Sequence, residues 1–247
     1  MNIKIVETSL NLRIERGKRK EDYLISKDIA KKQLSFANTD IYANVEFMDC
    51  DTTDYLKVFE ASGYNNYISL DAKGRGILCE IKKEYVVKKI GEMTEPHMLH
   101  LRVEKGDEYI DLITVRLLVA GGNDADFKDR NKQWNKVLSY IESLSDKSHL
   151  VLTGDFNHGV INNDINGYRN RPRQYFNYQM VAKDLKNKNI ILYPMEGNSY
   201  RGYMKIDHIA TGEKILVENA VYDDIFSNTE IIGIPDHSCI IANIKCA

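Results

Sequence analysis

Residues 150–159 read Leu150-Val-Leu-Thr-Gly-Asp155-Phe-Asn157-His-Gly159, a short apolar run that ends in a glycine turn. The turn presents a carboxylate and a carboxamide two residues apart. In an extended segment, residues i and i+2 point to the same side, so Asp155 and Asn157 are expected to converge on one point. Asp and Asn also favour ordinary turns, so this stretch alone leaves a purely structural turn as an equal alternative.

Two more sets of polar residues follow similar apolar runs. One is Lys205-Ile-Asp207-His208-Ile209, and the other is Pro235-Asp236-His237, which leads into an apolar segment. Three acidic positions at expected strand ends, two of them beside a histidine, indicate a metal-dependent hydrolase.

Composition limits the class of protein. The chain has 247 residues, of which 43% are hydrophobic, and its formal net charge is -2. An anionic ligand must therefore be bound by a local patch. The first residues do not read as a secretory signal, and no apolar run approaches the roughly 20 residues that span a bilayer. The four cysteines show no C-x-x-C spacing, which favours buried thiols in a reducing cytoplasm.

Strand-like and helical patterns alternate along the whole chain. We expect strands at residues 3–6, 41–47, 77–81, 98–103, 109–118, 149–153, 190–193, 206–210, 215–221 and 239–244. We expect helices over residues 29–37, capped by Ser26, over 129–144 and over 176–185, with loops at 120–126 and 159–175. Without a Pro- or Ser-rich linker, one α/β domain over residues 1–247 fits best.

The order of these motifs resembles the endonuclease/exonuclease/phosphatase superfamily, the fold of deoxyribonuclease I, over nearly the whole chain. G-D-F-N at residues 154–157 is similar to the family's G-D-x-N motif. D-H at 236–237 looks like its S-D-H motif, and I-D-H-I at 206–209 looks like its I-D-H/Y-I/V segment. Arg130 and Gln133 echo its R-x-x-Q pattern. The resemblance implies a four-layered α/β (α+β) sandwich of two mainly antiparallel β-sheets flanked by helices.

The resemblance also implies a metal site. Residues 40–46, D-I-Y-A-N-V-E, are similar to the family's D-I-x-x-L-Q-E strand, so Glu46 and Asp236 are expected to bind Mg2+, for which Mn2+ can substitute. Hard cations of this kind prefer oxygen ligands. Asn11 takes the place of the asparagine in the family's W-N motif, although Leu10 replaces the tryptophan, and is expected to support the metal shell.

The remaining roles concern the phosphate and the attacking water. Phosphodiester hydrolysis needs a cation, a positioned water and help for the leaving oxygen. The resemblance implies that Asp155 orients or deprotonates the water, while Asn157 holds the water or a phosphate oxygen. It implies further that His237, oriented by Asp207, hydrogen-bonds the phosphate and stabilises the transition state.

One position departs from the family at the phosphate itself. Arg116 stands where the family has His or Tyr, which contacts the scissile phosphate. We expect Arg116 to make that contact, because the planar guanidinium matches phosphate oxygens.

The other histidines are expected to be structural. His208 follows Asp207 and should point to the opposite face of its strand, and His158 is expected to be a loop residue near the site. His97, His100 and His149 are expected at surface positions or with their polar groups satisfied.

A basic, aromatic segment follows the G-D-F-N turn. We expect Arg169, Arg171 and Arg173, with Tyr168 and Tyr175, to form a substrate-binding rim. Arginines pair with phosphates and tyrosines stack on bases. Residues 13–20 add further positive charge after Asn11. The alternative is a solvated loop and an ordinary charged surface.

The leading hypothesis is therefore a cytoplasmic Mg2+-dependent nuclease or nucleotide phosphodiesterase that acts on nucleic acid or nucleotides without membrane insertion. One alternative is a phosphatase or phosphodiesterase of small phosphorylated molecules or lipid head groups. Another is a non-catalytic binding protein on the same fold. The joint presence of Glu46, Asp155, Asn157, Asp236 and His237 argues against that last reading.

Overall fold

The computed structural model describes residues 1–12, 27–50, 52–158, 174–226 and 233–246. Two six-stranded sheets dominate it, with the strand orders β11-β12-β1-β2-β4-β3 and β5-β6-β7-β8-β10-β9. The first sheet contains β1 (Asn2–Ser9), β2 (Ile41–Met48), β3 (Tyr64–Leu70), β4 (Arg75–Lys82), β11 (Ile215–Asp223) and β12 (Cys239–Cys246). The second contains β5 (Val86–Thr94), β6 (His97–Lys105), β7 (Glu108–Arg116), β8 (Leu150–Asp155), β9 (Ile190–Leu192) and β10 (Asp207–Gly212).

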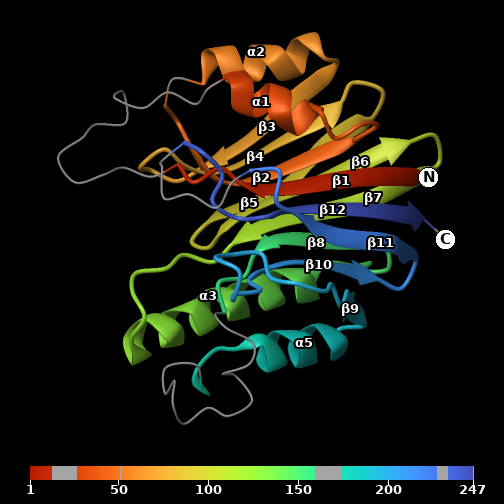
Figure 1. Ribbon diagram of the computed structural model, residues 1–247. Coiled ribbons are helices and arrows are strands. Elements are labelled where there is room, and N and C mark those ends of the chain that lie inside the picture. The colour runs from red at the N-terminus through yellow and green to blue at the C-terminus, as the bar shows by residue number, and fades with distance from the viewer. Residues whose placement is uncertain (13–26, 51, 159–173, 227–232, 247) are drawn as a thin grey trace.

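Helices cover the outer face of each sheet. Figure 1 shows α1 (Lys27–Leu34) and α2 (Thr53–Ala61) over the first sheet, and α3 (Asp124–Ser143) and α5 (Tyr178–Lys186) over the second. Each sheet has one parallel pair, β1 with β2 and β7 with β8, and its other pairs are antiparallel. The predicted four-layered sandwich of two mainly antiparallel sheets is confirmed.

Three apolar clusters hold the layers together. The cluster between the sheets joins residues such as Ile5 and Ala43 of the first sheet to Leu112 of the second. A second cluster packs Trp134 of α3 onto the second sheet, and a third packs Phe59 of α2 onto the first. Because helices cover the outer faces, the central strands are buried on both sides and read as continuous apolar runs.

The predicted first residues of two helices differ from those in the structure. The helix expected from residue 129 begins at Asp124, because the Asn123 side chain accepts a hydrogen bond from the Asp126 amide at 3.0 Å and caps it. The loop expected over 120–126 therefore ends at Asn123. In the same way Asn177 caps α5, so Phe176 lies before that helix. The proposed cap Ser26 lies outside the described residues.

Three elements were not predicted: α2, β3 and β5. β5 alternates between exposed and half-buried positions and has β6 as its partner in the sheet order, at the edge of the second sheet. Its lysines suit an exposed edge strand, and they interrupt the run of apolar residues by which a strand is predicted from sequence. No helix in the described part of the chain is long and apolar enough to cross a membrane. The four cysteines are free, and three of them are buried.

Strand register brings the polar strand ends together. Asp155 ends β8 and pairs with Asp207 on one side and with Arg116 on the other. His237 lies just before β12 of the other sheet. One end of the sandwich therefore collects polar residues that are far apart in the sequence.

Candidate active site

The G-D-F-N turn requires its glycine. Gly154 has a φ of 130°, and a Cβ at this position would lie 2.0 Å from the backbone oxygen of Val115 on the neighbouring strand. A glycine therefore lets β8 approach β7 closely just before the carboxylate. Asp155 Oδ1 then accepts a hydrogen bond from the Asn157 amide at 2.9 Å. The hydrogen bond that closes the turn therefore also brings Asp155 and Asn157 together.

Asn157 is fixed from several directions. Its Nδ2 donates to Asp155 Oδ2 and, at 2.8 Å, to the backbone oxygen of Leu117. Both hydrogens of the carboxamide are thus used, which leaves Oδ1 for a ligand. Arg130 of α3 donates to the backbone oxygen of Asn157, and Gln133 binds both backbone groups of Leu118 at 2.7 and 3.1 Å. The R-x-x-Q pair of the sequence therefore holds the turn and the segment beside it.

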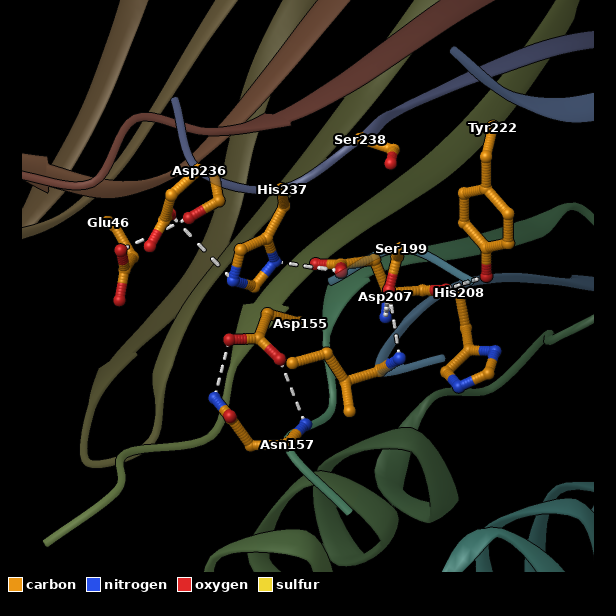
Figure 2. Close-up of polar contacts among 12 residues, drawn as sticks. Glu46, Asp155, Asn157, Ser199, Asp207, His208, Tyr222, Asp236, His237 and Ser238 are labelled. Carbon is orange, nitrogen blue, oxygen red and sulfur yellow. Dashed lines mark hydrogen bonds and ion pairs between the residues drawn. The ribbon is translucent and has the colours of Figure 1, made fainter. Parts of the chain in front are cut away.

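His237 and Asp207 form a buried hydrogen-bonded pair. His237 Nδ1 lies 2.8 Å from Asp207 Oδ2, as the sequence interpretation required (Figure 2). Asp207 is held in turn by Tyr222, whose hydroxyl donates to the Asp207 backbone oxygen at 2.7 Å, and by Ser199, whose Oγ accepts from the Asp207 amide. Burial lowers the pKa of His237, but the adjacent Asp207 carboxylate outweighs it and raises the pKa to about 10. His237 is therefore an imidazolium at neutral pH.

Asp155 is poised between its two protonation states. Its side chain is buried, and burial raises the pKa of its carboxyl group. The Asp207 carboxylate raises it further, while His237 and Arg116 oppose the change, so that the pKa is about 7. A carboxylate with a pKa near the working pH suits a general base.

Glu46 and Asp236 line one cavity of about 560 Å³ together with Asp155, Asn157 and His237. Figure 2 shows Glu46 and Asp236 on one side of His237 and Asp207 on the other. Glu46 has a φ of 54° and lies where the pairing of β2 with β4 shifts register, a bulge that re-aims a side chain. Its Oε2 accepts from the Ser9 hydroxyl at 3.1 Å, and its Oε1 is paired with Arg116.

Asn11 joins the segments that carry these two carboxylates. Its Nδ2 donates to the backbone oxygen of Ile234 at 3.1 Å, two residues before Asp236. The next residue, Leu12, donates its amide to the Glu46 backbone oxygen at 3.1 Å. Asn11 and Leu12 thus tie the backbone near Asp236 to the backbone of Glu46, which fits a supporting position for Asn11.

Among the described residues around the cavity, two groups of side chains could hold a metal. Asp155, Asp207 and His237 offer ligand atoms within 4.8 Å of one another. In that group, however, Nδ1 of His237 is committed to its hydrogen bond with Asp207, so a metal there would have to break the pair. Glu46 and Asp236 offer carboxylate oxygens at one cavity, which is the donor set that Mg2+ prefers. The residues at this second position fit the expected cation better.

The sequence interpretation missed Glu7. This residue of β1 is 1% exposed, and neither of its carboxyl oxygens has a hydrogen-bond partner among the described residues. Burial, and then the Asp207 carboxylate, raises its pKa well above the usual range. The available signal was a carboxylate directly after the apolar residues Ile5 and Val6 of β1.

Three further residues that line the cavity were not predicted to lie there. Arg75 and His97 line it, and both contact Asp71, Arg75 through Nη2 at 2.9 Å and His97 through Nε2 at 3.3 Å. Tyr200 places its ring 4.6 Å from the His237 ring. They come from β4, from β6 and from the segment before β10, so no local pattern joins them.

The remaining histidines have partners. His158 and His208 are buried with their Nε2 atoms 2.7 Å apart, so His208 is structural, as expected, and His158 is its partner rather than an open loop residue. His100 contacts the Tyr140 hydroxyl at 2.8 Å, and His149 contacts Ser148 at 3.1 Å. His149 has a partner, as expected, whereas His97 and His100 are buried and each keeps one ring nitrogen that has no hydrogen-bond partner among the described residues.

Most of the expected substrate rim lies outside the described residues: Tyr168, Arg169, Arg171 and Arg173, together with the basic run at 13–20. Tyr175 is described. It is half-buried against the apolar cluster of α3 and α5, and Lys128 Nζ lies 4.3 Å from its ring centroid. Its ring is therefore partly committed to packing, which reduces the area left for stacking.

No protein-family model and no curated protein match this sequence. Solved structures match over the whole chain. The endonuclease domain of TRAS1, a telomere-specific non-LTR retrotransposon, has a TM-score of 0.65 at 14% identity, with 100% of this chain and 99% of that chain covered. D. rerio TDP2 complexed with single strand DNA product has a TM-score of 0.64 at 13% identity, with 99% of each chain covered.

A third similar structure is an endonuclease/exonuclease/phosphatase family protein from Bacteroides thetaiotaomicron. It has a TM-score of 0.63 at 14% identity, with 99% of this chain and 97% of that chain covered. The chain has the fold of the endonuclease/exonuclease/phosphatase superfamily, as its motifs indicated.

Proposed function

We propose that this protein is a phosphodiester hydrolase that uses a divalent cation, with Mg2+ as the natural ion and Mn2+ as a substitute. Residues 1–247 would act as one catalytic domain. The observation that carries the proposal is the buried His237–Asp207 pair, which opens on the same cavity as the carboxylates of Asp155, Glu46 and Asp236. A cavity with a protonated histidine, a poised carboxylate and two oxygen donors matches what the hydrolysis of a phosphodiester demands.

Each side chain has a defined part in this mechanism. Glu46 and Asp236 would hold the cation, which neutralises charge that develops on the phosphate. Asp155, with a pKa of about 7, accepts a proton from the attacking water, and Asn157 Oδ1 orients that water. The His237 imidazolium donates through Nε2 to a phosphate oxygen, because Nδ1 is committed to Asp207. Asn11, with the Leu12 amide, would keep the segments that carry both metal ligands in place.

The substrate we propose is a nucleic acid or a nucleotide. Two structures with the same fold support this choice, the TRAS1 endonuclease domain and the TDP2 complex with a single-stranded DNA product. In this chain the support is the basic, aromatic segment after the Asp155 turn, with arginines that can pair with backbone phosphates. Arg169, Arg171 and Arg173 would track the polynucleotide, while Arg116 acts at the scissile phosphate.

One observation favours a second candidate, a phosphodiesterase of small phosphorylated molecules. The cavity, at about 560 Å³, has the size of a small-ligand site and includes apolar side chains such as Phe47 and Phe127. A free nucleotide or another small phosphodiester would fill it without any contact to a rim.

The experiment is a substrate panel with two proteins. Wild type and a triple variant, Arg169→Ser, Arg171→Ser and Arg173→Ser, are assayed on single-stranded DNA, RNA, a dinucleotide and a chromogenic phosphodiester, with Mg2+ and with EDTA. The nuclease proposal predicts turnover only with the cation. It also predicts that the triple variant loses polynucleotide affinity and salt dependence but keeps turnover of the chromogenic ester. Unchanged cleavage of DNA and RNA by the triple variant at every salt concentration would favour the small-substrate candidate.

A further inference from the structure

Arg116 occupies an unusual position between two carboxylates. It ends β7, where its backbone pairs with Asp155 on one side and with His97 on the other. Its Nη2 forms an ion pair with Glu46 Oε1, and its Nε lies 4.0 Å from Asp155 Oδ2. The side chain is 19% exposed, so water screens these contacts only in part.

The two oxygens of Glu46 are both engaged. Oε1 is paired with Arg116, and Oε2 accepts from the Ser9 hydroxyl at 3.1 Å. A divalent cation that binds Glu46 must therefore displace Arg116 from Oε1 or share the carboxylate with it. Two positive charges next to one carboxylate repel each other, so sharing weakens both contacts.

The surrounding charge explains why an arginine can stay there. Asp155 and Asp236 line the same cavity as Glu46, and Asp207 offers a carboxylate oxygen within 4.8 Å of a carboxylate oxygen of Asp155. Without another cation this cluster is strongly acidic, and buried like charges raise one another's free energy. The Arg116 guanidinium supplies a fixed positive charge at the point where Glu46 enters the cluster.

We propose that the Arg116 guanidinium competes with the divalent ion for the Glu46 carboxylate. When the ion binds, Arg116 leaves Glu46, and its guanidinium becomes available to the phosphate of the substrate. Metal binding and the Arg116–Glu46 contact then oppose each other, and each weakens the other by the same factor. The inference rests on the proposed function, because it takes Glu46 as a metal ligand.

The test measures metal binding rather than turnover. Isothermal titration with Mg2+ and with Mn2+ is performed on wild type, Arg116→Met and Arg116→Gln. The glutamine variant keeps a hydrogen-bond donor for Glu46 without the charge, which guards against a methionine variant that fails to fold. Arg75→Met is the matched control, because Arg75 lines the same cavity but pairs with Asp71 and not with an expected metal ligand.

We expect both Arg116 variants to bind the cation at least tenfold more tightly than wild type. Arg75→Met should stay within about threefold of wild type, because a charge that is not in contact with the ligand acts only through screened, longer-range repulsion. In a second readout, the Arg116 variants should melt at a lower temperature than wild type in EDTA. Added Mg2+ should raise their melting temperature by more than it raises that of wild type.

The outcomes separate the two levels of the proposal. If wild type binds the cation and the Arg116 variants bind no more tightly than Arg75→Met, the competition does not exist and the inference is wrong. If neither wild type nor any variant binds Mg2+ or Mn2+, the metal site of the proposed function is wrong and the inference falls with it. A Glu46→Gln protein that still binds like wild type would show that the cation sits elsewhere, which also overturns the inference.

Discussion

Replacing Asp207 with asparagine is the sharpest perturbation of the site. Asp207 is fully buried and accepts from His237 Nδ1 at 2.8 Å, and its carboxylate is the main reason that His237 stays protonated. The pKa of His237 rises from 6.5 to about 10. At about 1.4 kcal/mol per unit, this corresponds to a preference for the imidazolium of about 5 kcal/mol. Asp207→Asn keeps the shape but removes the charge, and burial then favours the neutral ring.

We therefore expect the pKa of His237 to fall by at least about two units in metal-free Asp207→Asn. Turnover should fall by about 10²- to 10⁴-fold, as it does when one acid or base group is lost. The pKa is measured by NMR titration of the His237 ring in EDTA. Asp71→Asn is the control, because Asp71 contacts a different buried histidine, His97, and should leave His237 unchanged.

The same pair affects stability in a defined pH range. Because the folded pKa of His237 is raised, the pair stabilises the metal-free protein fully below pH 6.5 and less and less as the pH rises toward 10. Wild type should lose this contribution between those values, and Asp207→Asn should not. If His237 in Asp207→Asn keeps its pKa within half a unit of wild type, the electrostatic account of the pair is wrong.

Three other variants test separate parts of the structure. Burial lowers the pKa of His208 to about 4, so wild type should lose about 2 kcal/mol of stability in urea between pH 7 and pH 5, and His208→Phe should lose less. Glu7→Met should stabilise the fold by about 1–3 kcal/mol, more at pH 8 than at pH 5, because the raised pKa of Glu7 makes its ionisation costly in the folded protein. Equal gains at the two pH values would contradict that reasoning. Gly154→Ala should cost about 3 kcal/mol, since the new Cβ would meet the Val115 backbone oxygen at a positive φ; a melting temperature equal to wild type would refute it.

The strands and the central turn were predictable because they are local. The apolar runs report burial on both faces of central strands, and the G-D-F-N spacing reports one turn. α2 had a local signal as well, Tyr55 and Phe59 four residues apart and both buried, which is the spacing of one helix face. β5 had none, because the exposed Lys88 and Lys89 interrupt its few apolar residues.

The long-range contacts of the site were not predictable in the same way. Arg116 and Glu46 lie 70 positions apart and on different sheets, so their pairing depends on how the sheets stack. The contact of Arg116 with the scissile phosphate stays a prediction, and its pairing with Glu46 was not expected from the sequence. Glu7 was missed because periodicity tells which face of β1 is buried but not which polar residue is buried there without a partner.

The most direct test of the central claim is turnover of a chromogenic phosphodiester by wild type and by Asp155→Asn at saturating Mg2+. The asparagine can still accept from the Asn157 amide but loses the oxygen that accepts from Asn157 Nδ2, so turnover is compared well below a moderately lowered melting temperature. We predict that wild-type turnover disappears in EDTA and that Asp155→Asn lowers kcat by about 10²-fold or more. A folded Asp155→Asn protein with wild-type kcat, or wild-type turnover that persists in EDTA, would contradict the account.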